Sequence, residues 1–421
     1  MRKGGILQRF AVDESRLTTV AVGLFGLNLI LLALAGPFVR KISTVHLLVA
    51  TIAGVQGLLA VFLYARRGFF IRDAAVGVFL LYFLLVPGYS LWMGHPAGDI
   101  IRGIVPFLFF PLAYFSVVTW NWSQTRLVVL LFAILSVLIS LEVVPFLLGK
   151  LTQKDPYYRL TAYSDNAHLP YYIAALALVG GNINRRLFRV LAYSTLLLAI
   201  LFTKSKGQVG EAFLVLVALS LLRWKYKKRR WPLASDWKEY GSVFVIVSVV
   251  FFGVNYLSNT NVFQDGKIEW GGLFDFSRNL GLERYSVEGL KGLTTQHRMQ
   301  EFREASKLFL ENPVLGAGPG ATFEFESPIS NQVVTQRYIH NAPFYFLATG
   351  GVVGLAVSGL PLVVGMIMAG RAWKNDHARR ITVAMFAILL YTLISANFKL
   401  IQFNVVLGLL IGALSVLNDT E

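Results

Sequence analysis

Residues 73–93 read DAAVGVFLLYFLLVPGYSLWM, an apolar block with one charge, at its first position. A helix of about twenty residues crosses roughly 30 Å of hydrocarbon. Similar blocks recur along the chain, and they are continuous, whereas barrel strands would alternate apolar and polar residues over about ten positions. Inside lipid only helices and closed barrels satisfy their own backbone polar groups. The blocks therefore predict an all-α, polytopic helical membrane protein.

The composition agrees with this class. The 421 residues are 55% hydrophobic and 15% charged, whereas soluble domains carry about 25% charged residues. The chain has no cysteine, which excludes disulfides, thiolate nucleophiles and Cys-ligated metals. The net charge of +16 comes with basic residues gathered in short loops, which is typical of the cytoplasmic loops of membrane proteins. We therefore expect membrane lipids, and no nucleic acid, as partners.

The hydropathy pattern predicts about twelve spans, with edges uncertain by roughly two to four residues. We place them near residues 17–36, 44–65, 73–93, 101–119, 125–148, 168–183, 187–203, 208–223, 241–257, 341–370, 381–397 and 400–417. This divides the chain into residues 1–257 with spans one to nine, a loop domain at 258–340, and residues 341–421 with the last three spans.

The positions of lysine and arginine predict the orientation. With the N-terminus inside, more than half of the 39 basic residues fall in short cytoplasmic segments, the densest between Arg223 and Lys238. In membrane proteins, short loops on the cytoplasmic side carry an excess of Lys and Arg. Both termini are therefore expected in the cytoplasm, and the loop at 258–340 on the outer face.

The long loop at 258–340 is the natural place for a site, because loops longer than about 12–15 residues are uncommon unless functional. One part reads as a helix that ends at Asn312-Pro313. The stretch VLGAGPG at 314–320 reads as a tight backbone turn. No Gly-Lys-Ser/Thr follows it, so it is not a phosphate-binding loop.

The stretch RYIHNAP at 337–343 opens the tenth span. Pro343 suits the first turn of a helix, which puts His340 at the helix N-terminus. The partial positive charge there favours a neutral imidazole, which can accept a proton from a hydroxyl group. The alternative is an interfacial histidine that makes one ordinary hydrogen bond.

This stretch resembles the signature of bacterial O-antigen ligases, which is His, then Asn, Ser or Gln, nine residues, and Gly-x-x-Gly. Here these are His340, Asn341, residues 342–350, Gly351 and Gly354. Three further segments are similar to segments of the O-antigen ligase and polymerase family: Arg298 with EFREA at 301–305 and NPVLGAGPG at 312–320, YRLTA through Asp165-Asn166, and TKSKG at 203–207. The family often has Arg-Gly in the last segment, where this chain has Lys206-Gly207. An ammonium keeps the charge but loses bidentate phosphate binding.

The resemblance, over roughly residues 150–370, implies a metal-independent, C-type glycosyltransferase of the bacterial inner membrane with its active site on the periplasmic face. The donor would be a glycan on undecaprenyl diphosphate, and no cofactor is expected. His340 and Arg298 would be catalytic. Guanidinium groups suit a diphosphate, and the expected substrate-binding residues are Arg159, Lys206, Arg284, Arg303, Arg337 and Asn341. Any one of these charges could instead be solvated or contact lipid headgroups. The outer segments contain no Asp-x-Asp motif, so we expect no metal.

Three functions remain open from the sequence. The first is an O-antigen ligase, whose acceptor is the core oligosaccharide on lipid A. The second is the related polymerase, whose acceptor is another lipid-linked repeat unit. The third is a secondary transporter that would use Glu142 and Glu211, although no two-half repeat is evident. The His-Asn motif favours the ligase. His297 matches no motif, and we expect it to be dispensable.

Overall fold

The computed structural model describes residues 14–34, 43–67, 73–144, 147, 168–182, 185–202, 206–226, 233–259, 290–328, 332–393 and 396–420. The helices in the first part of the chain are α1 (Glu14–Leu34), α2 (Ser43–Arg67), α3 (Ala74–Trp92), α4 (Ala97–Val118), α5 (Trp122–Ser140), α7 (Leu169–Asn182), α8 (Arg186–Phe202), α9 (Lys206–Tyr226) and α10 (Leu233–Asn259). They are followed by α14 (Leu290–Glu311), β1 (Phe323–Ser327), β2 (Gln332–Gln336), α15 (Ala342–Arg371), α16 (Asp376–Tyr391), η6 (Ala396–Lys399) and α17 (Ile401–Thr420).

Each of the twelve segments that the sequence marks as a span coincides with a helix of this fold. Within the described residues, six helices are long and apolar enough to cross a membrane by length and composition: α1, α3, α4, α5, α15 and α17. The structure therefore shows a mostly helical protein with several helices that are long and apolar enough to cross a membrane. The number of about twelve spans stays a prediction.

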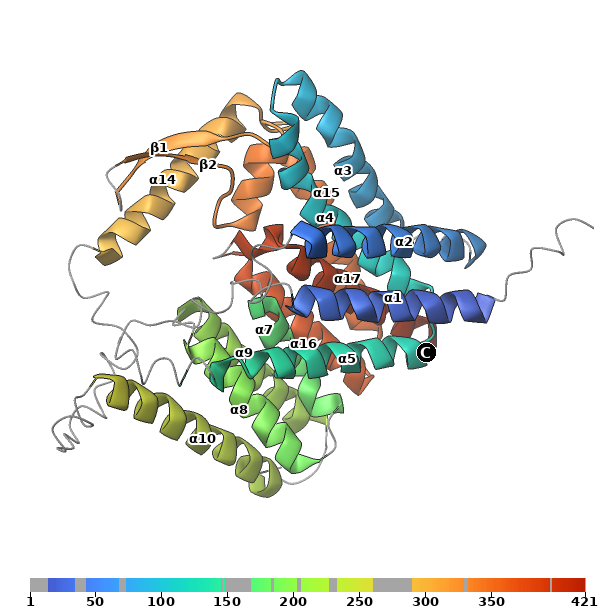
Figure 1. Cartoon of the computed structure of the whole chain (residues 1–421), viewed down its shortest axis with the longest axis vertical. Helices are drawn as coiled ribbons and strands as arrows, with labels where there is room; N and C mark the ends of the chain where they lie inside the picture. Colours follow the sequence, from blue (N-terminus) through green and yellow to red (C-terminus); the bar gives the residue numbers. More distant parts are fainter. Residues whose placement is uncertain are drawn as a thin grey trace, which may run out of the picture.

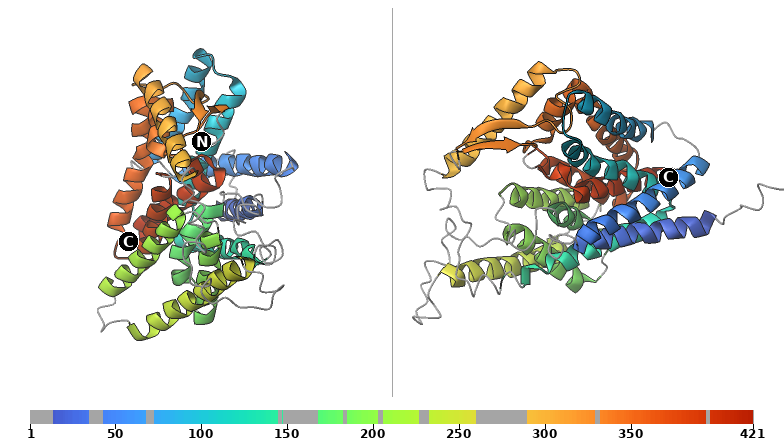
Figure 2. Two further views of the ribbon diagram at one scale, coloured as in Figure 1. Left: turned by 90° about the vertical axis from the view of Figure 1, so that its left-hand side faces the viewer. Right: turned by 45° about the horizontal axis from the view of Figure 1, so that its top comes forward.

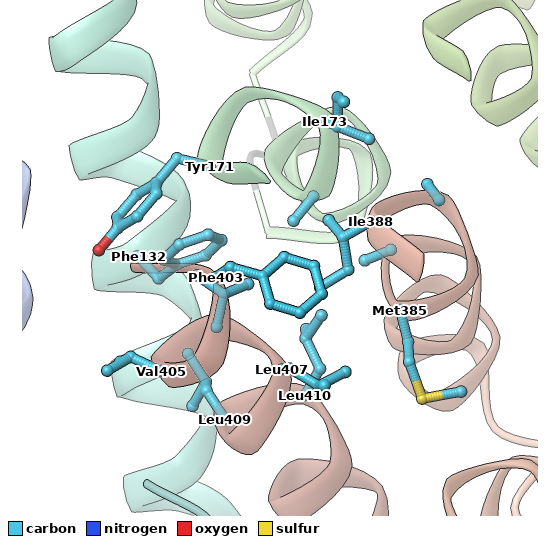
Figure 3. Close-up of a cluster of buried hydrophobic side chains, with 14 of the residues drawn as sticks. Phe132, Tyr171, Ile173, Met385, Ile388, Phe403, Val405, Leu407, Leu409 and Leu410 are labelled. Carbon is cyan, nitrogen blue, oxygen red and sulfur yellow. The ribbon is translucent and has the colours of Figure 1, made fainter. Parts of the chain in front are cut away.

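The core of the bundle is built around α17, which packs most extensively against α4 and also contacts α16, α15 and α5. Figure 3 shows Phe403 and Leu410 of α17 beside Ile388 of α16 and Phe132 of α5. Gly408 lets α17 approach α4 closely, because a Cβ there would meet the Ala113 Cβ at 2.7 Å. Small residues at such crossings are common where membrane helices pack by contact.

The two ends of the bundle hold different connections. At one end, α14 and the two strands lie beside α15, α3 and α4, and α8 and α10 lie far from them (Figures 1 and 2). We call this the α14 end. Here the Tyr89 hydroxyl donates a hydrogen bond to the Gly316 carbonyl at 2.9 Å. At the opposite end Arg67 pairs with Asp419 at 2.5 Å, and Trp122 packs on His377. The contacts thus pair connections that the predicted orientation puts on the same side.

The sheet corrects the expectation that the fold is all-α. Strands β1 and β2 form an antiparallel hairpin, with Phe323 opposite Gln336 and Ser327 opposite Gln332. In β1, FEFES, side chains alternate between buried and exposed, which is the period-2 pattern of a half-buried strand. The alternation covers only five residues, and we read this part of the loop without assigning strands to it.

Candidate active site

Helix α14 presents Glu301 to the protein interior. Its side chain is fully buried, whereas Arg298 and Arg303 are exposed. At 100° per residue, Arg298 lies about 60° from Glu301 around the helix, and Arg303 lies about 160° away. Arg298 therefore flanks the Glu301 face, and Arg303 points to the other side. The predicted end of this helix at Asn312-Pro313 is confirmed, since α14 ends at Glu311.

Glu301 binds His340. The Nδ1 atom of His340 lies 3.0 and 2.9 Å from the two Glu301 oxygens. The His340 backbone N–H also donates to Oε2 at 3.3 Å. A carboxylate accepts hydrogen bonds and cannot donate them, so this partner assigns the ring proton to Nδ1. The Nε2 atom of the neutral ring is then the acceptor, and the side chain is 29% exposed. This is the arrangement in which a carboxylate orients a histidine base.

His297 reaches the same carboxylate from one helical turn earlier on α14. Its Nε2 lies 3.2 Å from Glu301 Oε1, and its Nδ1 lies 3.1 Å from the Ser327 hydroxyl. The Gln336 side-chain amide lies 3.1 Å from the same Nε2. The structure thus brings together two histidines and one buried glutamate. The sequence motif points only to His340.

The segment 337–342 is anchored to the connection between α16 and α17. Asn341 caps α15: its Oδ1 accepts the Phe344 N–H at 3.1 Å, and its Nδ2 donates to the Leu393 carbonyl at 2.9 Å. Both ends of this amide therefore bind the protein itself, which favours positioning over the substrate contact expected for Asn341. Pro343 lies in the first turn, as the sequence predicts.

Arg337 and Lys399 flank the same segment. The Arg337 guanidinium lies 3.1 Å from Asp99 Oδ1 and is 45% exposed. Lys399 Nζ donates to the Arg337 carbonyl at 2.9 Å and lies 4.5 Å from the Tyr345 ring centroid. Burial, together with the charge of Arg337, lowers the pKa of Lys399 to about 8. Among the arginines predicted to bind substrate, Arg337 is the one closest to His340 in sequence.

The glycine motif, Gly351 and Gly354, determines the backbone of α15 next to the site. Helix α15 is broken at Gly351, whose φ of 61° and ψ of −159° are accessible to glycine alone. The turn after α14 fills the break: the Val352 N–H donates to the Pro313 carbonyl at 2.9 Å, and the Gly318 N–H donates to the Thr349 carbonyl at 2.9 Å. The interpretation of 314–320 as a tight turn is confirmed. The motif joins the loop to α15.

Other predicted residues are not placed. Arg159 and Arg284 lie outside the described residues, and Lys206 begins α9 but its side chain is not described. Within the part of the chain that the structure describes, no group of three or more acidic or histidine side chains is arranged to hold a metal ion. Glu301 lies in the family-like segment at 301–305. The i, i+4 spacing of His297 and Glu301 indicates a shared helix face, but nothing in the sequence links that face to His340.

The comparison with known families covers this region. Residues 191–358 match the family model described as O-antigen ligase. The match runs from α8 to the break in α15 and includes Arg298, Glu301 and His340. No curated protein matches the chain significantly. The resemblance to the O-antigen ligase and polymerase family that the sequence motifs indicate is therefore confirmed over residues 191–358.

Proposed function

We propose that this protein is an O-antigen ligase of the bacterial inner membrane, with both termini in the cytoplasm and the α14 end in the periplasm. It transfers O-antigen glycan from undecaprenyl diphosphate to the core oligosaccharide of lipid A. The observation that carries the proposal is the buried Glu301 bonded to Nδ1 of His340, which leaves Nε2 as a base for an acceptor hydroxyl.

The reaction follows from these groups. His340 Nε2 takes the proton of the acceptor hydroxyl while that oxygen bonds to the anomeric carbon of the donor sugar. The bond from the anomeric carbon to the diphosphate breaks, and its electron pair leaves with the diphosphate. Arg298 stabilises the charge that develops there, because preorganised cations stabilise a charged leaving group. Glu301 holds His340 in position and stabilises the imidazolium that forms.

The family match covers both ligases and polymerases, which differ in the acceptor. The pattern His340, Asn341, nine residues and Gly-x-x-Gly supports the ligase. The exposed cations on the α14 end, Arg298, Arg303 and Arg337, suit a phosphate-bearing donor. A metal-independent reaction is part of the proposal.

The test uses the full-length protein in proteoliposomes, with undecaprenyl-diphosphate-linked glycan as donor and lipid A with its core as acceptor. We expect transfer to lipid A core, in the presence or absence of EDTA. His340→Ala should abolish most of it, whereas His377→Ala, at the opposite end of the bundle, should leave it unchanged. Products that contain only joined donor glycans would establish the polymerase instead. Full transfer by His340→Ala would refute the site, and loss in EDTA restored by a divalent cation would refute the metal-free mechanism.

A further inference from the structure

The carboxylate of Glu301 is shared between two imidazoles. Its side chain has no exposed surface, and it meets His340 Nδ1 at 2.9 Å and His297 Nε2 at 3.2 Å. A buried carboxylate is costly unless hydrogen-bond donors surround it. Here His340 supplies two donors, Nδ1 and its backbone N–H, and His297 of α14 places Nε2 against Oε1, so the two histidines contact the glutamate from two sides.

His297 is itself oriented by the hairpin. Its Nδ1 lies 3.1 Å from the Ser327 hydroxyl at the end of β1. The Phe325 ring packs edge-on at 4.9 Å, and the Gln336 amide of β2 lies 3.1 Å from Nε2. When the Ser327 hydroxyl donates to Nδ1, the ring proton sits on Nε2, which lies 3.2 Å from Glu301 Oε1. The Gln336 amide nitrogen is itself a donor, so it makes no hydrogen bond to Nε2 in this tautomer. Strand β1 thus holds the ring with Nε2 turned toward Glu301 Oε1.

We infer that His297 is a positioning residue that acts through Glu301 on His340, and that strand β1 sets the orientation of its ring. The inference rests on the proposed function, because it assigns His297 to the base of that reaction. It replaces the expectation from the sequence that His297 is dispensable. His297 Nε2 contacts Glu301 Oε1, so it keeps the carboxylate from rotating away from His340 Nδ1.

Such a role predicts a loss in kcat and not in KM. His297 is assigned no substrate contact, so removing it should leave donor and acceptor KM unchanged. Loss of a group that orients a metal-ligating histidine typically costs about 10–100-fold in activity, and His297 orients the partner of a histidine in a comparable way. We expect His297→Ala to lower kcat by about that factor. We expect His297→Gln to recover much of it, since a glutamine amide nitrogen occupies about the position of Nε2.

A double-mutant cycle tests whether the effect passes through Glu301. Kinetics are measured for His297→Ala, Glu301→Gln and the double variant in the same proteoliposomes. Residues that act as a unit show non-additive losses, so the double variant should be no slower than Glu301→Gln alone. Gln296→Ala, an exposed neighbour on α14, and Glu304→Gln, which pairs with Lys307, are the matched controls and should keep full kcat.

Each alternative result has a distinct meaning. Additive losses, or an unchanged kcat in His297→Ala, would overturn the inference while leaving the proposed function intact. A lower unfolding temperature of His297→Ala with unchanged kcat would reduce His297 to a contact that supports the fold. Full transfer by His340→Ala would overturn the proposed base, and this inference with it. Loss of transfer in His340→Ala together with additive losses in the His297 cycle would overturn this inference alone.

Discussion

The two ring nitrogens of His340 have different surroundings, and this decides which substitution tests the base. Nδ1 is taken by Glu301, so an asparagine, whose amide nitrogen replaces Nδ1, keeps that bond and presents nothing at Nε2. A glutamine presents an amide near Nε2 that can bind the acceptor hydroxyl but cannot take its proton. General-base assistance contributes about 10²–10⁴-fold. We expect His340→Ala, His340→Asn and His340→Gln all to lose activity by that order while still binding the donor.

The measurement is kcat for transfer, together with retention of labelled lipid-linked donor on the purified variants. His340→Asn separates positioning from base catalysis only if the asparagine amide can reach the acceptor hydroxyl. The contact with Glu301 makes glutamine the sharper choice. If His340→Gln transfers glycan nearly as fast as the wild type, His340 positions the acceptor and does not take its proton.

Arg298 flanks the Glu301 face of α14 and is exposed, so a substrate phosphate can reach it. We predict that Arg298→Ala strongly reduces turnover. Arg298→Lys should recover little, because an ammonium cannot make the bidentate contact of a guanidinium. Arg303→Ala, from the other side of the helix, is the control and should have the weaker effect. Near-normal kcat in Arg298→Lys would remove Arg298 from the diphosphate contact.

At the scale of elements, the break in α15 depends on one glycine. Any other residue at position 351 would have to adopt a backbone conformation that costs roughly 1–3 kcal/mol. Its Cβ would also meet the Val314 carbonyl. We predict that Gly351→Ala lowers the unfolding temperature and the transfer rate together, because the turn at 313–318 would leave the break. Gly359→Ala, in the same helix with no atom within 4 Å of the added Cβ, should lower neither. Equal stability of the two variants would show that the turn is not held by the break.

Lys399, in η6, binds the segment 337–342 and makes the stability of the fold depend on pH. Its pKa is lowered to about 8 from 10.5 in the unfolded chain. Between these values the unfolded protein binds the proton and the folded protein does not, so the Lys399 contribution to stability rises with pH in this window. We predict that the unfolding temperature of the wild type, relative to Lys399→Met, is constant below about pH 7 and increases from about pH 8 to 10. A difference that falls with pH would contradict the lowered pKa.

At the scale of the whole molecule, the prediction concerns orientation. Contacts at each end of the bundle pair connections that the distribution of Lys and Arg assigns to one side, such as Arg67 with Asp419. A reporter fused after Arg230 should therefore be cytoplasmic, and one inserted near Asn279 should be periplasmic. Both positions lie outside the described residues, and reporter activity in cells reads them directly. Reporters on the same side would overturn the predicted number of spans.

The sequence predicts the helical membrane class and the positions of the helices, and its motif singles out the His340 segment as a candidate site. These features are local: hydropathy and a short motif can be read within about twenty residues. Even so, the hairpin was missed, because five alternating residues are too short a signal.

The surroundings of His340 depend on packing between distant segments. Glu301 lies 39 positions before it in sequence, and the two meet because α14 packs on α15 while the turn at 313–318 docks into the break at Gly351. The partner of a ring nitrogen depends on such long-range packing, which no local pattern encodes. The structure therefore places Glu301 and His297 around the His340 ring and Lys399 beside the segment 337–342. It also shows that Asn341 caps α15, while a substrate contact of Asn341 stays a prediction.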